Sequence, residues 1–182
     1  MDLHYDTSKL QMLFSPEQIR GRVRELGAEI SAHYEKLLAE GEMVLVIGIL
    51  NGAFVFMSDL IREMTVPLET DFIRLSSYED HLSSSSKVVM LKNFEREVKH
   101  RHVLVVEDIA DVGLTLNWLL EHLKTQEPAS VRLAVAVDKS ARREVKVGLD
   151  YVGFTIDDGF LVGYGLDAAR RYREFPAIYT LG

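Results

Sequence analysis

The hydrophobic positions near the start of the chain recur with a helical period, which predicts an amphipathic helix. The segment opens with Ser15, Pro16 and Gln18, which supply the hydroxyl cap, first-turn proline and reciprocal glutamine of a helix N-terminus. We expect one long helix from Ser15 to about Glu40. Its apolar positions are Ile19, Val23, Leu26, Ile30, Tyr34 and Leu37.

Further along, the segments 43–50, 102–106 and 131–137 are mainly apolar on both faces, which is typical of strands buried in a parallel sheet. Stretches long enough for helices separate them. The alternation predicts an α/β fold in which helices flank a mainly parallel sheet and ligands bind at the carboxyl ends of its strands. We expect strands at 43–50, 69–77, 88–91, 102–106, 131–137, 151–156 and 160–164, and helices at 54–64 and 116–123.

Residues 77–87 interrupt this pattern with four consecutive serines and few apolar side chains. This composition predicts a mobile loop, which fits either an idle surface loop or a lid. No repeat or linker divides the chain, so we expect residues 1–182 to form a single domain with further elements appended after residue 148.

Composition and charge narrow the functional classes. The 182 residues are 47% hydrophobic, enough for one core, and the net charge of −7 argues against general binding to nucleic acid or anionic membranes. No apolar run is long enough to cross a bilayer, and the first residues lack the order of a signal peptide, so we expect a cytoplasmic protein. Because the chain has no cysteine, a bound metal would need oxygen or imidazole ligands, which favours Mg²⁺. His100 and His102 are expected in a solvated loop, with a metal site as the alternative.

Candidate chemistry is concentrated in residues 107–115, EDIADVGLT, between a predicted strand and a predicted helix. Main-chain amides and the helix dipole bind anions at such junctions. The carboxylates of Glu107, Asp108 and Asp111 would repel phosphate, unless they address hydroxyl groups, a divalent cation or a proton to be removed. A phosphorylated sugar with metal-bound hydroxyl groups meets these requirements. The structural alternative is a helix cap by Asp111 followed by a glycine turn.

This segment resembles the phosphoribosyl pyrophosphate signature of type I phosphoribosyltransferases, in which a hydrophobic strand precedes Glu-Asp, two apolar residues and Asp-Thr-Gly. The resemblance implies that Glu107 and Asp108 lie near the ribose hydroxyls and bound Mg²⁺, and that Asp111 acts as base toward the purine N7 proton. The loop would hold the 5-phosphate of phosphoribosyl pyrophosphate. Its residues are Asp111, Val112, Gly113, Leu114 and Thr115.

Six further segments, in order, resemble the hypoxanthine/guanine branch of this family, from about Phe14 to Tyr172. The resemblance implies the type I phosphoribosyltransferase fold, with a small hood formed by the terminal segments. It also implies Mg²⁺-dependent synthesis of IMP and GMP, plus pyrophosphate, from phosphoribosyl pyrophosphate and hypoxanthine or guanine, by a homodimer or homotetramer. The six segments are 54–57, 71–73, 76–78, 138–139, 150–154 and 162–167.

The resemblance also implies a purine site. Lys139 would donate to the 6-oxo group, Phe160 would stack on the ring, and main-chain groups of Leu161 would meet the base edge. Without the resemblance, Lys139 would be interpreted as a surface charge and Phe160 as part of the core. Ser77 and Tyr78 would belong to a lid that excludes water from the reacting centre.

The pyrophosphate would lie at the other end of the site. Asp167 would bind Mg²⁺ on the pyrophosphate, while Arg173, Asn51 and Gly52 would contact the pyrophosphate itself. The structural alternatives are a cap on a short tail helix for Asp167 and a surface pair with Glu174 for Arg173.

Two residues depart from the usual family pattern. Asn51 stands where many members carry lysine, which removes a positive charge. Because the preceding peptide bond is often cis in the family, the resemblance makes Leu50–Asn51 a candidate for the cis form. Val112 replaces a threonine whose hydroxyl would donate to the 5-phosphate.

Two alternatives remain open. The enzyme could prefer another base such as xanthine. A different class is a regulatory protein that keeps the cosubstrate site, has lost catalysis and binds nucleic acid. The acidic charge and the retained Asp111, Lys139 and Asp167 argue against this second alternative.

Overall fold

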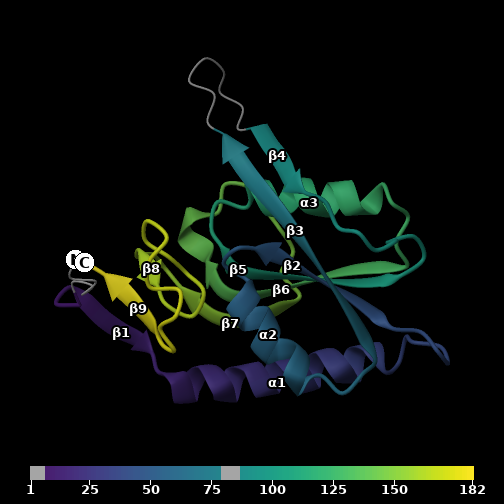
Figure 1. Cartoon of the computed structure of the whole chain (residues 1–182), viewed down its shortest axis with the longest axis horizontal. Coiled ribbons are helices and arrows are strands. Elements are labelled where there is room, and N and C mark those ends of the chain that lie inside the picture. The colour runs from purple at the N-terminus through teal and green to yellow at the C-terminus, as the bar shows by residue number, and fades with distance from the viewer. Residues whose placement is uncertain (1–6, 79–86) are drawn as a thin grey trace.

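The predicted α/β fold with a mainly parallel sheet is confirmed by a computed structural model, which describes residues 7–78 and 87–182 (Figure 1). In this part of the chain, a six-stranded sheet has the order β4-β3-β2-β5-β6-β7. Neighbouring strands are parallel except β4, which pairs antiparallel with β3 at the edge. The strands are β2 (Val44–Leu50), β3 (Leu68–Tyr78), β4 (Lys87–Lys92), β5 (His102–Ala110), β6 (Ser130–Lys139) and β7 (Tyr151–Ile156).

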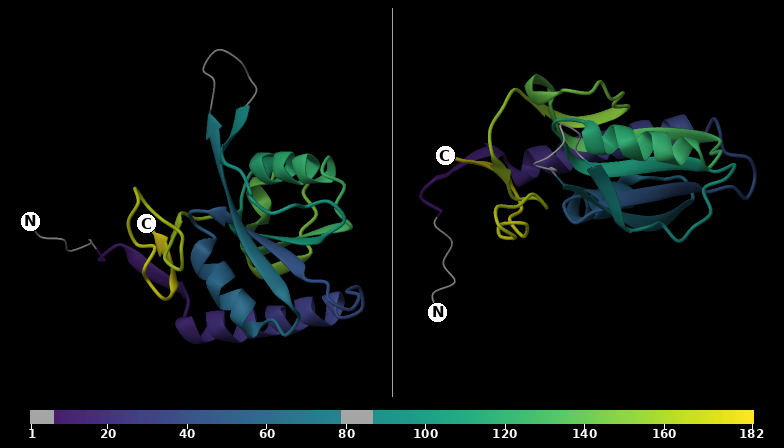
Figure 2. Two further views of the ribbon diagram at one scale, coloured as in Figure 1. Left: turned by 45° about the vertical axis from the view of Figure 1, so that its right-hand side comes forward. Right: turned by 90° about the horizontal axis from the view of Figure 1, so that it is seen from above.

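Helices cover both faces of this sheet, because alternate residues of the central strands are buried on opposite sides. Val44 and Val46 of β2 pack in one core with α1 (Pro16–Tyr34) and α2 (Phe54–Glu63). Leu45 and Ile47 of the same strand pack in the other core, with α3 (Leu114–Lys124). Figure 2 shows α1 and α2 on one side of the sheet and α3 on the other. No helix among the described residues combines the length and apolarity that a membrane crossing requires.

The predicted start of α1 is confirmed, but its predicted end is wrong. Ser15 Oγ accepts from the Gln18 N–H, and the Gln18 side chain accepts from the Ser15 N–H, which completes the capping box. The helix ends at Tyr34 instead of about Glu40. The chain then turns, with Leu37 and Leu38 both donating to the Tyr34 carbonyl, so that it can enter β2. Leu37 continued the helical period but is 42% exposed.

A second, three-stranded sheet forms a hood from both terminal regions, in the order β1-β9-β8. It comprises β1 (Leu10–Phe14), β8 (Leu161–Val162) and β9 (Ile178–Leu181), which are antiparallel. The hood is joined to the main body by its apolar side chains, such as Ile178, which pack in the core shared with α1 and α2, and by two specific contacts. The rings of Phe14 and Phe154 stack at 4.0 Å, and the Tyr164 hydroxyl hydrogen-bonds Asp59 of α2 at 2.9 Å.

The structure corrects two predicted boundaries near the carboxyl ends of the strands. β5 continues to Ala110, so Glu107 and Asp108 belong to the strand and not to the loop after it. Ser77 belongs to β3, as the predicted strand 69–77 implied, but Tyr78 extends β3 and Lys87 begins β4 where a loop was predicted. Cross-strand pairing with β4 holds these positions extended. The rest of the predicted loop, 79–86, lies outside the described residues.

Candidate active site

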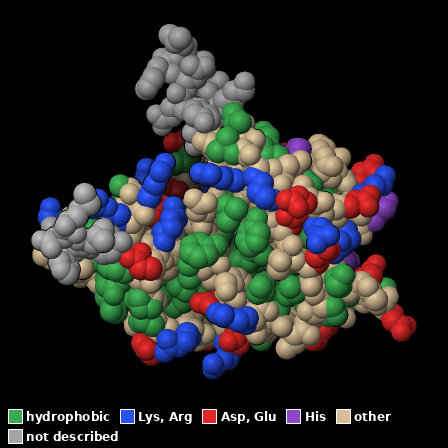
Figure 3. All heavy atoms as spheres, viewed as in Figure 1, with side chains coloured by type: hydrophobic (Ala, Val, Ile, Leu, Met, Phe, Trp, Pro, Cys, Tyr) green, Lys and Arg blue, Asp and Glu red, His purple; other side chains and the backbone are tan. Residues whose placement is uncertain are grey.

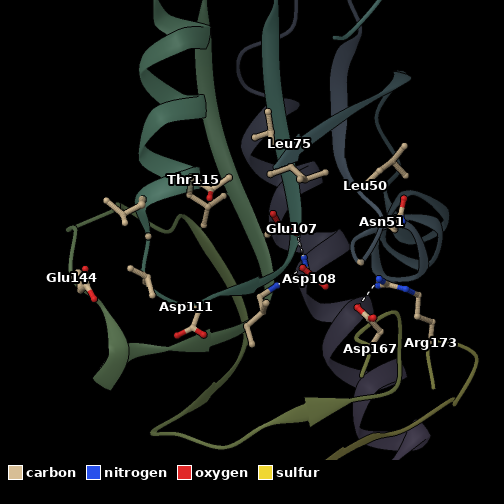
Figure 4. Close-up of a pocket in the computed structure, with 17 residues that line it drawn as sticks. Leu50, Asn51, Leu75, Glu107, Asp108, Asp111, Thr115, Glu144, Asp167 and Arg173 are labelled. Atoms are coloured by element: carbon tan, nitrogen blue, oxygen red, sulfur yellow. Dashed lines mark hydrogen bonds and ion pairs between the residues drawn. The ribbon is translucent and has the colours of Figure 1, made fainter. Parts of the chain in front are cut away.

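A pocket of about 530 Å³ opens where the ends of β2 and β5 meet the start of α3 and the hood (Figure 4). The register brings these elements together, because Gly48 of β2 lies beside Val106 of β5, and Ala110 of β5 beside Asp138 of β6. The loops that follow therefore leave the same edge of the sheet. The lining residues are Ile49, Leu50, Asn51, Gly52, Leu75, Glu107, Asp108, Ile109, Asp111, Val112, Gly113, Leu114, Thr115, Leu116, Glu144, Asp167 and Arg173.

Two glycines allow three parts of the chain to converge on this pocket. A Cβ on Gly52 would lie 1.6 Å from Asp108 Oδ2, so no side chain fits between the β2 loop and β5. A Cβ on Gly165 would lie 2.2 Å from the Gly52 carbonyl oxygen, and its φ of +96° favours glycine. The Leu50–Asn51 peptide bond is cis, as the family resemblance implied.

The acidic pair lines the pocket from the end of β5. Asp108 N–H donates to Glu107 Oε1, and Ile109 N–H donates to Asp108 Oδ1, both at 2.9 Å. Burial, together with the neighbouring Asp108 carboxylate, raises the pKa of Glu107 well above its ordinary value. A cation or hydroxyl donors bound here would offset the repulsion between the carboxylates of Glu107 and Asp108.

The segment after β5 presents main-chain N–H groups to the pocket. Gly113 precedes α3 in a left-handed conformation, with φ of +93°. Within the described part of the chain, the N–H groups of Val112, Gly113, Leu114 and Thr115 have no acceptor, and all four residues line the pocket. Free N–H groups at the start of a helix bind anions through hydrogen bonds and the helix dipole. Asp111 does not cap α3, which has no side-chain cap, so the helix-cap alternative is wrong.

Asp111 faces two basic side chains. Its Oδ2 atom is 3.9 Å from Lys139 Nζ and 3.3 Å from the Arg142 guanidinium. Its Oδ1 atom is buried and has no partner among the described residues. Lys139 is only 4% exposed, so the surface-charge alternative for it is wrong. The free oxygen of Asp111 can accept a proton from a ligand, and the buried Lys139 ammonium beside it can donate a hydrogen bond to the same ligand.

Asp167 and Arg173 reach the pocket from the hood as a pair. Arg173 Nη2 lies 2.5 Å from Asp167 Oδ1, and Arg173 Nη1 donates to the Gly165 carbonyl at 2.5 Å (Figure 4). Asp167 Oδ2 accepts from the Arg170 N–H at 2.7 Å, within a turn and not a helix. Both structural alternatives, a helix cap for Asp167 and a Glu174 partner for Arg173, are therefore wrong.

The remaining predicted residues lie apart from the pocket lining. Phe160 precedes β8 with its side chain 55% exposed, which contradicts the core alternative, and Leu161 is buried in β8. Neither residue lines the pocket. Ser77 and Tyr78 lie at the end of β3, and their side chains fall outside what the structure describes.

Sequence reasoning missed the segment after β6. Glu144 lines the pocket, and Arg142 and Arg143 contact Asp111 from the short 3-10 turn Ser140–Arg142 and the residue after it. The run Arg-Arg-Glu has the composition of a solvated surface. The usable signal was its place immediately after Lys139, at the carboxyl end of a buried strand.

The predicted metal ligands do not form one cluster. The described residues contain no group of three or more His, Cys, Asp or Glu side chains that would hold a metal ion unaided. Glu107 and Asp108 lie on β5, whereas Asp167 belongs to the hood. Mg²⁺ is commonly held by one or two protein carboxylates together with water and substrate phosphate oxygens. The carboxylates on both sides fit Mg²⁺ that arrives with a phosphorylated ligand.

Comparison with known proteins identifies the family. Residues 15–169 match the phosphoribosyl transferase domain. The chain is 44% identical over 171 residues to a hypoxanthine-guanine phosphoribosyltransferase of Mycobacterium avium, covering 93% of this chain and 84% of the relative. It is 43% identical over 169 residues to a hypoxanthine phosphoribosyltransferase of Salmonella typhimurium, covering 93% of both. The structure of a Trypanosoma cruzi hypoxanthine phosphoribosyl transferase superimposes with a TM-score of 0.89 at 39% identity, covering 94% of this chain and 91% of that one. By sequence and by structure, this chain belongs to the phosphoribosyl transferase domain family.

Proposed function

We propose that this enzyme transfers the ribose phosphate of phosphoribosyl pyrophosphate to hypoxanthine or guanine, releasing pyrophosphate. One observation carries the proposal: four main-chain N–H groups that have no acceptor among the described residues lie in the same pocket as a pair of adjacent carboxylates. The N–H groups suit a phosphate, and the carboxylates suit hydroxyls or a cation. A phosphorylated sugar carries both kinds of group.

The cosubstrate would lie along the pocket. The N–H groups from Val112 to Thr115 would bind the 5-phosphate, and Glu107 and Asp108 would accept from the ribose hydroxyls. Arg173 would contact the pyrophosphate beside Asn51 and Gly52, which line the pocket next to it. Its guanidinium would then form charge-assisted hydrogen bonds with the leaving group.

We infer a requirement for Mg²⁺. Glu107 and Asp108 on one side and Asp167 on the other would hold it, with further oxygen ligands from the cosubstrate. Bound there, Mg²⁺ would neutralise charge on the pyrophosphate oxygens. The raised pKa of Glu107 supports this proposal, because a cation would stabilise the ionised carboxylate.

The purine would approach from the side of Asp111. As the purine N9–C1′ bond forms and the C1′–O bond to pyrophosphate breaks, the N7 proton would pass to Asp111, whose Oδ1 atom has no partner within residues 7–78 and 87–182. Lys139, 3.9 Å from Asp111 Oδ2, would donate to the 6-oxo group. The exposed ring of Phe160 would stack on the base, with Leu161 main-chain groups at its edge.

Ser77 and Tyr78 would form part of a lid at the end of β3, which would shield the reacting centre from water. We further propose that the enzyme forms a homodimer or homotetramer and acts in the cytoplasm, as the family resemblance and the sequence predict.

The regulatory alternative is not favoured. The relatives that match 93% of the chain are named as phosphoribosyltransferases. Acidic as well as basic side chains lie on the face seen in Figure 3, and the net charge of −7 argues against general nucleic-acid binding. A preference for xanthine is the remaining enzyme alternative.

The test incubates the protein with phosphoribosyl pyrophosphate, Mg²⁺ and hypoxanthine, guanine or xanthine, and measures nucleotide and pyrophosphate. We expect IMP and GMP in amounts equal to pyrophosphate, and much slower turnover by Asp111→Asn at unchanged cosubstrate affinity. If only xanthine were converted, the proposed specificity for hypoxanthine and guanine would be wrong and the enzyme would be specific for xanthine. No nucleotide from any base, combined with thermal stabilisation by the cosubstrate, would favour the regulatory protein.

A further inference from the structure

Arg143 holds the main chain of the loop between β5 and α3. Its guanidinium donates to the carbonyl of Asp111 at 3.0 Å through Nε and to the carbonyl of Ala110 at 3.2 Å through Nη2. Nη2 also forms an ion pair with the Asp138 carboxylate. The Arg143 side chain is only 14% exposed and does not line the pocket, so its contacts are with the protein and not with the pocket space.

The two residues after Arg143 continue this pattern. The N–H groups of Glu144 and Val145 both donate to the Val112 carbonyl, at 3.0 and 3.2 Å. A Cβ on Gly113 would lie 2.6 Å from the Val145 carbonyl oxygen and 2.9 Å from Arg143 Cδ, so the two segments are closely packed. Three successive carbonyls, from residue 110 to residue 112, are therefore bound by residues 143–145.

This arrangement fixes the orientation of the peptide units in the loop. The carbonyl and N–H groups of one peptide plane point in opposite directions. Because residues 143–145 bind the carbonyls of Asp111 and Val112, the N–H groups of Val112 and Gly113 are turned away from that segment. Both are among the four N–H groups that have no acceptor in the described structure.

We propose that Arg143 is a positioning residue that orients this loop for the 5-phosphate, acting through the carbonyls of Ala110 and Asp111. The inference rests on the proposed function. Its neighbour Arg142 differs, because Arg142 contacts the Asp111 side chain and is 51% exposed. A planar guanidinium reaches two carbonyls and a carboxylate at once, whereas a lysine ammonium on a flexible stem does not reproduce that fork.

The experiment separates the two ends of the cosubstrate. Ribose 5-phosphate probes the loop, and Mg²⁺-pyrophosphate probes the end near Arg173; each is measured as a competitor of phosphoribosyl pyrophosphate. In Arg143→Ala we expect the inhibition constant of ribose 5-phosphate and the KM for the cosubstrate to rise about tenfold, the equivalent of about one charged hydrogen bond. The inhibition constant of Mg²⁺-pyrophosphate should change less than about twofold. Arg143→Lys should lie between Arg143→Ala and the wild type.

Asp138→Asn is the matched control, because it removes the ion pair and leaves both carbonyl contacts of Arg143 in place. We expect it to lower the melting temperature while the ribose 5-phosphate constant stays near the wild-type value. If Arg143→Ala does not fold, the inhibition constants of ribose 5-phosphate for Arg143→Lys and Asp138→Asn are compared instead. A higher constant for Arg143→Lys than for Asp138→Asn would support the positioning role. Equal weakening of both competitors, no weakening of either, or weakening by Asp138→Asn as large as by Arg143→Ala or Arg143→Lys would overturn the positioning role. Absence of nucleotide synthesis by the wild type would instead refute the proposed function.

Discussion

Val112 offers a direct test of how the loop binds phosphate. The residue lines the pocket and is partly exposed, and its carbonyl is held by two N–H groups, so the main chain should keep its position when the side chain changes. Val112→Thr keeps nearly the same shape and adds a hydroxyl donor. A hydrogen bond to a charged group contributes about 1.5–3 kcal/mol. Because the new hydroxyl is partly solvated before binding, we expect the lower end, about 1.5 kcal/mol, or about a tenfold lower KM for phosphoribosyl pyrophosphate.

The assay is steady-state IMP synthesis with the cosubstrate varied at saturating hypoxanthine and Mg²⁺, together with ribose 5-phosphate as a competitor. Both the KM and the inhibition constant should fall in Val112→Thr, while the KM for hypoxanthine stays unchanged. Val112→Ala controls for the loss of a methyl group and should not lower either constant. Unchanged constants in Val112→Thr, or an equal fall in Val112→Ala, would refute the assignment of this loop to the 5-phosphate.

Three further predictions follow from charge and burial. Asn51→Lys should strengthen cosubstrate binding by about 0.5–1 kcal/mol at low ionic strength, and by less at high salt; Asn51→Gln, measured in parallel, should not. The pKa of Glu107 is raised in the folded protein, so as the pH rises past 4.5 the unfolded chain loses the Glu107 proton before the folded chain does. Without metal, the folded protein therefore loses stability as the pH rises above this value. Glu107→Gln should therefore raise the melting temperature in EDTA at neutral pH and give no gain below about pH 4, whereas an equal gain at both pH values would contradict the shift. Phe160→Ala should raise the KM for hypoxanthine about tenfold through lost stacking and leave the melting temperature unchanged, because the ring is 55% exposed; a large fall in stability would assign Phe160 to the core.

Sequence patterns predicted the central fold because each signal was local. Residues 44–50 alternate between two buried faces, so their strand was apolar throughout, and Ser15 with Gln18 marked the start of α1. The hood strand β1 was missed because it pairs Leu10 with Leu181, at the opposite end of the sequence, and its central residues are exposed. A strand stabilised by a distant partner and with little burial leaves no periodic signal.

The site divides in the same way. The acidic pair and the loop from Asp111 to Thr115 were identified from one continuous segment. Arg143 and Glu144 were missed because they act on that loop from about thirty residues away, and their own neighbourhood has the composition of a solvated turn. The ion pair between Asp167 and Arg173 was also not predicted. From the sequence, a helix cap was as plausible for Asp167, and an ion pair with Glu174 was as plausible for Arg173.

The charges around the pocket explain why the departure at Asn51 should make metal more important. Five described lining residues carry a carboxylate and one carries a guanidinium, so the pocket would repel a polyanionic ligand. The loop N–H groups offset this at the 5-phosphate end only. At the other end Arg173 is already paired with Asp167, and Asn51 contributes no charge. Positive charge for the pyrophosphate must therefore come largely with the cosubstrate, as bound Mg²⁺. It follows that Asn51→Lys should reduce the Mg²⁺ concentration needed for half-maximal activity, and an unchanged Mg²⁺ requirement would place residue 51 away from the pyrophosphate.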